Sequence, residues 1–105
     1  MSIRYLVMFA ACMVISGNTL AEDGETLAEK NNCMSCHTIS ARSMGPAYRD
    51  VAARYRDNKN AQAMLEKKVR SGGAGAWGKM PMPATANSVS DSDIRNIVKW
   101  VLSLK

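Results

Sequence analysis

The sequence has little of what builds a large core or a β-sheet protein. Its 105 residues include one histidine, one phenylalanine and three cysteines. No stretch alternates apolar and polar residues over several pairs, so a half-buried β-sheet is not indicated. The length leaves room for one domain, which excludes an enzyme with a separate substrate domain. A hydrophobic content of 47% argues against a disordered chain.

Residues 1–21 have the composition of a secretory signal peptide. They contain one charged side chain, Arg4, followed by an uncharged apolar stretch over 5–15 and a small-residue end at Ala21. The apolar stretch is shorter than the roughly 20 residues that span a membrane. A lipoprotein acylated at Cys12 is the competing interpretation, which the bulky residues after Cys12 disfavour. We therefore expect cleavage after Ala21, export to the periplasm and no stable membrane insertion.

The remaining chain, 22–105, is expected to form one domain with a thin core. It has 23 apolar side chains larger than alanine and no phenylalanine. A domain of this size needs a further stabilising element, such as a disulfide, a metal or a large apolar cofactor. Without Arg4 the formal charge falls from +5 to +4, which favours acidic protein partners. Export and the lack of a dense basic run argue against nucleic acid.

Helical spacing of apolar residues recurs in four segments, so the fold is expected to be all-α. They run from Asp23 or Gly24 to Lys30, from Tyr48 to Tyr55, from Ala61 to Val69, and from an N-cap at Ser90 through Leu102. Met64 lies on the apolar face of the third segment and is expected in the core. Residues 72–89 show no helical or strand pattern, and Trp77 within them indicates a loop held onto something.

The chemistry-bearing motif is Cys33-Met34-Ser35-Cys36-His37, the Cys-x-x-Cys-His pattern of c-type haem attachment. Two thiols three residues apart can form thioethers with the two vinyl groups of one porphyrin. His37 then lies under the iron as the proximal ligand, oriented by a backbone carbonyl on its other ring nitrogen. The pattern predicts one covalently bound haem c.

Three alternatives use the same residues. Cys33 and Cys36 would form a plain disulfide in an oxidising compartment. A thioredoxin-like redox pair would need a strand–helix context that the sequence lacks. A zinc site would need a fourth ligand, but residues 22–105 have no other histidine or cysteine besides His37 and this pair.

A six-coordinate haem needs a second axial ligand, and a methionine is the remaining choice. Met34 is inside the attachment turn, Met44 is close in sequence to the proximal side, and Met64 is assigned to the core. Met80 and Met82 remain, and flanking prolines would stiffen the approach of Met82, which we favour. A thioether ligand raises the reduction potential relative to a second histidine and closes the site, which suits electron transfer rather than catalysis.

In the order of its motifs, the chain resembles the class I c-type cytochromes of the small bacterial cytochrome c-551/c-552 (cytochrome c8) group. The resemblance extends over essentially all of 22–105. Its landmarks are Asn32–His37, Gly45–Ala52, Gly75–Gly78, Pro81–Pro83, Val89–Asp91 and Lys99–Ser103.

The resemblance implies a small single-domain fold of about four helices around one haem, with the first and last helices crossing. It implies thioethers at Cys33 and Cys36, axial bonds from His37 and Met82, and a hydrogen bond from the His37 ring to the Pro46 carbonyl. Trp77, with Lys68, would bind a haem propionate. In this family an amide after the axial methionine often orients it, and here the replacement is Asn87 or Thr85.

The expected function is that of a periplasmic, monomeric one-electron carrier rather than an enzyme. The resemblance implies redox partners of four kinds: membrane cytochrome complexes, nitrite reductase, peroxidases and terminal oxidases. The alternative is a haem enzyme or gas sensor with a labile sixth site.

Overall fold

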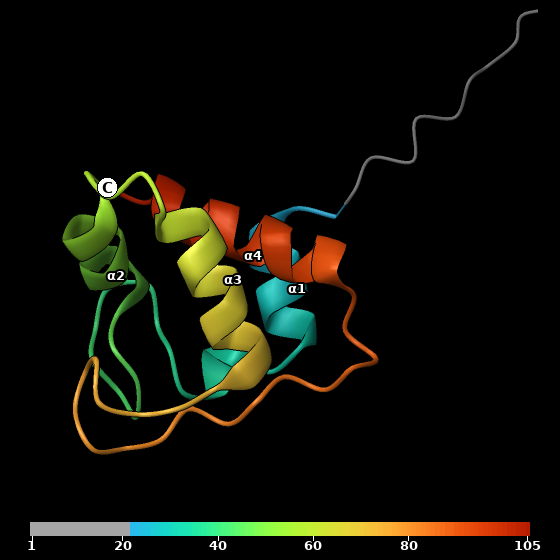
Figure 1. The fold of residues 1–105 in the computed structure, drawn as a ribbon, viewed down its shortest axis with the longest axis horizontal. Coiled ribbons are helices and arrows are strands. Elements are labelled where there is room, and N and C mark those ends of the chain that lie inside the picture. Colours follow the sequence, from blue (N-terminus) through green and yellow to red (C-terminus); the bar gives the residue numbers. More distant parts are fainter. Residues whose placement is uncertain (1–21) are drawn as a thin grey trace, which may run out of the picture.

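The computed structural model describes residues 22–105, which fold into four α-helices and one 3₁₀ turn (Figure 1). The elements are α1 (Gly24–Lys30), η1 (Cys33–Ser35), α2 (Tyr48–Tyr55), α3 (Ala61–Ser71) and α4 (Asp91–Ser103). Over these residues the only β-type pairing is an isolated bridge between Gly73 and Met82. The all-α prediction and all four helical segments are confirmed. The predicted signal peptide lies outside the described residues.

The first and last helices, α1 and α4, are each N-capped by a side chain. The Asp23 carboxylate accepts a hydrogen bond from the Thr26 backbone N–H at 2.8 Å. The Ser90 hydroxyl oxygen accepts from the Asp93 N–H at 3.0 Å, as the sequence predicts. Helices of 7 to 13 residues are marginal by themselves, so packing must supply most of their stability.

Helix α4 is the element on which the other three helices pack (Figure 1). Its apolar stripe is buried and consists of Ile94, Ile97, Val98 and Val101. Gly24 allows α1 to approach α4 closely, because a Cβ atom there would collide with the Asn96 carbonyl oxygen and Trp100 Cβ. None of the helices within 22–105 is both long enough and apolar enough to cross a lipid bilayer.

The prediction that Met64 belongs to the core is wrong, since its side chain is 41% exposed. The side of α3 toward α4 carries Leu65, which packs against the core, with polar contacts beside it. The Gln62 side chain donates to the Arg95 carbonyl, and Glu66 pairs with the Arg95 guanidinium. Met64 is two residues from both Gln62 and Glu66, about 200° around the helix. It therefore points away from α4.

The long segment between α3 and α4 runs along one side of the molecule without helix or extended sheet (Figure 1). It leaves α3 at Gly72, whose φ of 68° lies in the left-handed region that favours glycine. The Gly73 and Met82 backbones then exchange two hydrogen bonds, at 2.9 and 2.8 Å. This pairing closes residues 74–81 into a loop and fixes where Met82 lies. We call residues 72–90 the methionine loop.

Candidate functional site

A cavity of about 670 Å³ lies inside the domain, between the attachment turn, the helices and the methionine loop. Its lining residues fall within 30–33, 36–37, 44–51, 65–69 and 73–86, together with Val89 and with Ile97, Val98 and Val101 of α4. The lining contains all seven residues that the sequence analysis assigned to the site: Cys33, Cys36, His37, Pro46, Lys68, Trp77 and Met82.

The attachment turn is a single 3₁₀ turn that presents both thiols to the cavity. Asn32 enters it with a φ of 61°, a left-handed conformation that asparagine tolerates. The backbone N–H groups of Cys36 and His37 both donate to the Cys33 carbonyl, at 3.2 and 3.1 Å. The two thiols are free rather than joined as a disulfide. Burial raises the pKa of the Cys33 thiol.

The His37 ring is fixed by three contacts. Nδ1 lies 2.8 Å from the Pro46 carbonyl oxygen, so Nδ1 carries the proton and donates. The ring stacks on Tyr48 with centroids 4.9 Å apart and planes 18° apart. Gly45 lies against the imidazole, because a Cβ there would be 2.5 Å from Cε1. These contacts leave the Nε2 lone pair available to a metal.

Tyr48 and Gly45 are positioning residues that the sequence analysis did not single out. Tyr48 is buried and packs edge-on against Trp100 of α4, with centroids 5.4 Å apart. The stack of His37 on Tyr48 thereby connects the imidazole to the helix that organises the fold. The signal in the sequence was the run Gly45-Pro46-Ala47-Tyr48, in which a glycine and an aromatic residue flank the proline.

Two methionines of the methionine loop line the cavity, and they differ in exposure. Met82 is half-buried and paired with the Gly73 backbone, whereas Met80 is 64% exposed. Met44 also lines the cavity, with its sulfur 3.9 Å from the Cys36 sulfur, on the attachment side. Met34 and Met64 are absent from the lining. Met82 and Met80 are thus the methionines of the methionine loop that line the cavity.

Trp77 is held from outside the cavity by two arginines. The Arg54 guanidinium lies over its ring at 4.4 Å and donates to the Ala76 carbonyl at 2.7 Å. Arg42 donates to the carbonyl of Trp77 itself at 3.0 Å. Lys68 lines the cavity near Gly73, where an added Cβ would be 3.0 Å from its Nζ. Arg42 and Arg54 gave no signal in the sequence, since isolated arginines suggest solvated surface.

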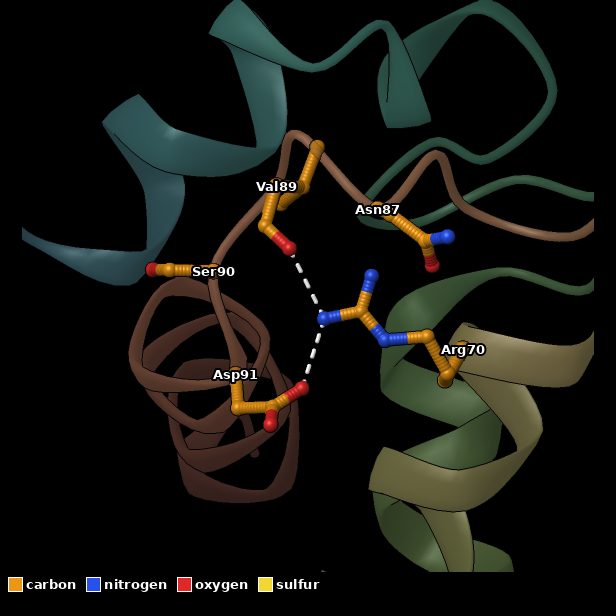
Figure 2. Close-up of a pocket in the computed structure, with 5 residues that line it drawn as sticks. All are labelled: Arg70, Asn87, Val89, Ser90 and Asp91. Carbon is orange, nitrogen blue, oxygen red and sulfur yellow. Dashed lines mark hydrogen bonds and ion pairs between the residues drawn. The ribbon is translucent and has the colours of Figure 1, made fainter.

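Thr85 and Asn87, the two candidates for orienting the methionine, lie in different places. Thr85 is part of the cavity lining. Asn87 lies instead in a separate pocket with Arg70, Val89, Ser90 and Asp91 (Figure 2). Of the two candidates, only Thr85 shares the cavity lining with Met82.

The donor set fits a haem better than it fits a bare metal ion. Among residues 22–105 no group of three or more His, Cys, Asp or Glu side chains is placed to hold a metal ion. A haem iron, by contrast, takes four ligands from the porphyrin and needs only two from the protein. The cavity supplies an apolar lining, two neighbouring thiols, an oriented imidazole and a thioether, which together suit a covalently attached haem.

Fold and site together define a small helical protein built around one covalent haem. A cytochrome c family model matches residues 21–105. The chain is 39% identical over 105 residues to cytochrome c-552 of Nitrosomonas europaea, covering 100% of both chains. It is 39% identical over 100 residues to cytochrome c-551 of Pseudomonas aeruginosa, covering 95% of this chain and 94% of that one.

The crystal structure of the Nitrosomonas europaea cytochrome c552 superposes with a TM-score of 0.73 at 43% identity. The superposition covers 77% of this chain and 99% of that one. The chain belongs to the cytochrome c family. It is a monohaem electron carrier with one covalently attached haem c.

The contact between Gly45 and the imidazole generates a prediction. Gly45→Ala places a methyl group against the His37 ring, which must shift and lengthen its bond to Pro46. We expect the free energy of unfolding of the oxidised holoprotein to fall by about 1–3 kcal/mol, measured by chemical denaturation. Ser43→Ala, in the same loop but exposed, is the control and should stay within about 0.5 kcal/mol. Equal free energies of unfolding for Gly45→Ala and Ser43→Ala would contradict a close contact between Gly45 and the His37 ring.

Proposed function

We propose that the haem is held by thioethers at Cys33 and Cys36 and by axial bonds from His37 and Met82. The protein then transfers single electrons at a closed iron and is not an enzyme. The observation that carries this is the arrangement around one cavity: His37 is oriented by Pro46 on one wall, and Met82 is fixed by Gly73 in the facing loop.

The chain's own groups explain why such an iron would exchange electrons readily. Haem iron cycles between its ferric and ferrous states, and a thioether ligand stabilises the ferrous one. The Pro46 carbonyl holds the His37 ring in one tautomer and one orientation in both states. The backbone pairing of Met82 with Gly73 restrains the opposite ligand. Two ligands that stay in place keep the structural change on electron transfer small.

Trp77 and Lys68 are proposed to bind a haem propionate. Both line the cavity, the indole N–H is a donor, and the lysine ammonium has the opposite charge to a carboxylate. The contacts of Arg54 and Arg42 fix the loop that carries Trp77, so its indole is held in place before the cofactor is bound.

The ligand assignment is tested by replacing Met82. Met82→Ala should open the iron, lower the reduction potential and let carbon monoxide bind to the reduced protein. The oxidised wild type should show a low-spin c-type spectrum with the weak far-red methionine–iron band, and no response to carbon monoxide when reduced. The measurements are absorption spectra and a redox titration.

Met80→Ala is the matched control, two residues away in the same loop. It should keep the far-red band and the potential. If Met80→Ala loses the band while Met82→Ala retains it, Met80 is the ligand. A wild-type protein that binds carbon monoxide would indicate the alternative, a haem enzyme or sensor with a labile sixth site.

We also propose that residues 1–21 are a cleaved signal peptide and that the carrier acts in the periplasm. Support comes from the apolar, nearly uncharged composition of 1–21. The exported holoprotein should begin at Glu22, and its intact mass should equal residues 22–105 plus one haem. A mass that retains Cys12 with an acyl chain would indicate a lipoprotein instead.

We propose that the partners are acidic redox proteins. The carrier is proposed to bind them as a monomer. Lys68 lines the cavity, as does Lys30, which is paired with Glu22 at 2.7 Å. Exposed Met44 and Met80 add apolar surface to the same lining. Positive charge near the haem attracts anionic partners and is screened by salt.

Salt dependence tests the charge proposal without a known partner. The rate at which hexacyanoferrate(III) oxidises the reduced protein should fall about threefold or more between about 10 mM and 300 mM salt. An uncharged quinone oxidant is the control, and its rate should change little. A hexacyanoferrate rate that rises with salt would mean a negative field at the haem.

A further inference from the structure

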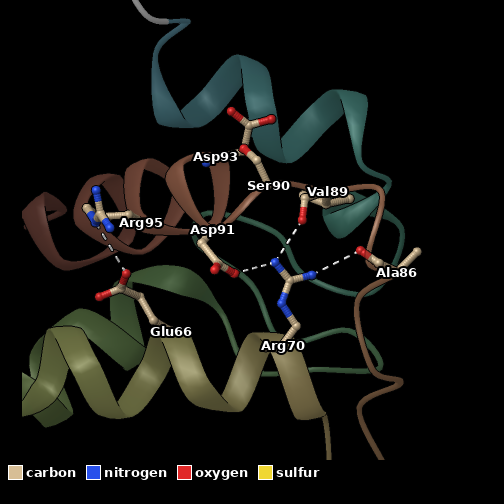
Figure 3. A network of polar contacts seen from close by, with 8 residues as sticks. All are labelled: Glu66, Arg70, Ala86, Val89, Ser90, Asp91, Asp93 and Arg95. Carbon is tan, nitrogen blue, oxygen red and sulfur yellow. Dashed lines mark hydrogen bonds and ion pairs between the residues drawn. The ribbon is translucent and has the colours of Figure 1, made fainter.

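Arg70 lies near the C-terminal end of α3, beside the part of the methionine loop that leads into α4 (Figure 3). Its guanidinium donates to the Ala86 carbonyl at 3.0 Å and to the Val89 carbonyl at 2.7 Å. It also pairs with the Asp91 carboxylate at 2.6 Å. The Thr85 N–H is shared between the backbone carbonyls of Val69 and Arg70, at 3.2 and 3.3 Å. The Arg70 side chain therefore holds the chain at three positions between 86 and 91, next to a backbone bond at Thr85.

The bonds to the two carbonyls matter more than the ion pair. The Asp91 side chain is 87% exposed, and exposed ion pairs are weak because water screens them. The Arg70 side chain is only 26% exposed, so its bonds to the Ala86 and Val89 carbonyls compete less with water. Removing the guanidinium would leave the Val89 carbonyl without its protein donor and the Ala86 carbonyl with only its bond from the Val89 N–H, at 3.0 Å. The turn over 86–89 would then lose its side-chain bonds to α3.

Met82 is connected to this anchored segment by a short length of chain. Only Pro83 and Ala84 separate it from Thr85, and on its other side its backbone is paired with Gly73. Arg70 itself is not part of the cavity lining and faces the separate pocket with Asn87 and Asp91 (Figure 2). Any influence of Arg70 on the haem iron must therefore act through the position of the loop.

We propose that Arg70 is a positioning residue for the sixth iron ligand. By fixing residues 85–91 to α3, it limits how far Met82 can move away from the iron. The proposal rests on the proposed function, in which Met82 is that ligand. It extends that function, because it assigns the strength of the methionine–iron bond to a side chain outside the haem cavity.

The test is displacement of the methionine by imidazole in the oxidised holoprotein. Arg70→Gln should bind imidazole about tenfold more tightly than wild type, because the loop opens more easily once the two charged hydrogen bonds are lost. Imidazole binding is followed by loss of the far-red methionine–iron band. Hydrogen exchange of the Thr85 amide in the holoprotein should become faster in the same variant.

Two variants separate this role from general stability. Arg95→Gln removes the Glu66–Arg95 pair, which joins the same two helices at 3.6 Å without touching the methionine loop. Asp91→Asn removes the charge of the exposed ion pair and keeps both bonds from Arg70 to the carbonyls. We expect imidazole affinities within about twofold of wild type for both, because each pair has one exposed partner, Arg95 or Asp91, and neither variant removes a bond from Arg70 to the loop carbonyls.

The outcomes are distinguishable. If Arg70→Gln matches Arg95→Gln in imidazole affinity while the wild-type band is present, the positioning role is wrong and the Met82 assignment stands. If the oxidised wild type lacks the far-red methionine–iron band, Met82 is not the ligand, and the positioning role proposed for Arg70 is wrong as well. If Arg70→Gln does not mature, Arg70→Lys is compared with Arg95→Lys. Arg70→Lys keeps the charge but loses the forked donor, so we expect it to bind imidazole about threefold more tightly than Arg95→Lys does. Equal affinities of the two variants would overturn the proposal.

Discussion

The structure depends on one constraint, which is the shortage of large apolar side chains available to the core. The buried core cluster contains Leu27, Ala28, Tyr48, Val51, Ile97 and Val101, and several of these belong to the cavity wall as well. A cavity of about 670 Å³ between such short helices is unfavourable unless something fills it. The covalent haem of the cytochrome c family fills it, so the cofactor is part of the core and the helices are arranged to enclose it.

The two sides of the cavity are held by different kinds of interaction. On the attachment side, a 3₁₀ turn, one carbonyl bond and an aromatic stack fix His37, and all of these lie within 16 residues of sequence. On the facing side, the methionine loop has no regular structure of its own. It is held by one isolated β-bridge and by Arg42, Arg54 and Arg70, which reach it from other parts of the chain. Local contacts thus orient His37, and long-range contacts position the loop that carries Met82.

This difference explains how far the sequence could be interpreted. The helices were predictable because their apolar residues recur at helical spacing, and Ser90 marks the start of α4. The attachment motif was predictable because its chemistry depends on spacing alone. Met64 was misplaced because helical spacing identifies an apolar stripe but does not say how much of it a neighbour covers. Leu65 of that stripe packs against the core, with Gln62 and Glu66 bound to α4 beside it, and Met64 is left exposed.

The sequence by itself determined the helical class and the Cys33–His37 motif, because spacing and composition are local properties of the chain. Only the tertiary structure decided that Tyr48 stacks on His37 and that Thr85, rather than Asn87, lines the cavity. The same holds for Arg70, whose partners are 16 to 21 residues away along the chain. Such contacts depend on how α3, α4 and the loop between them are packed, and no periodicity in the sequence encodes that arrangement.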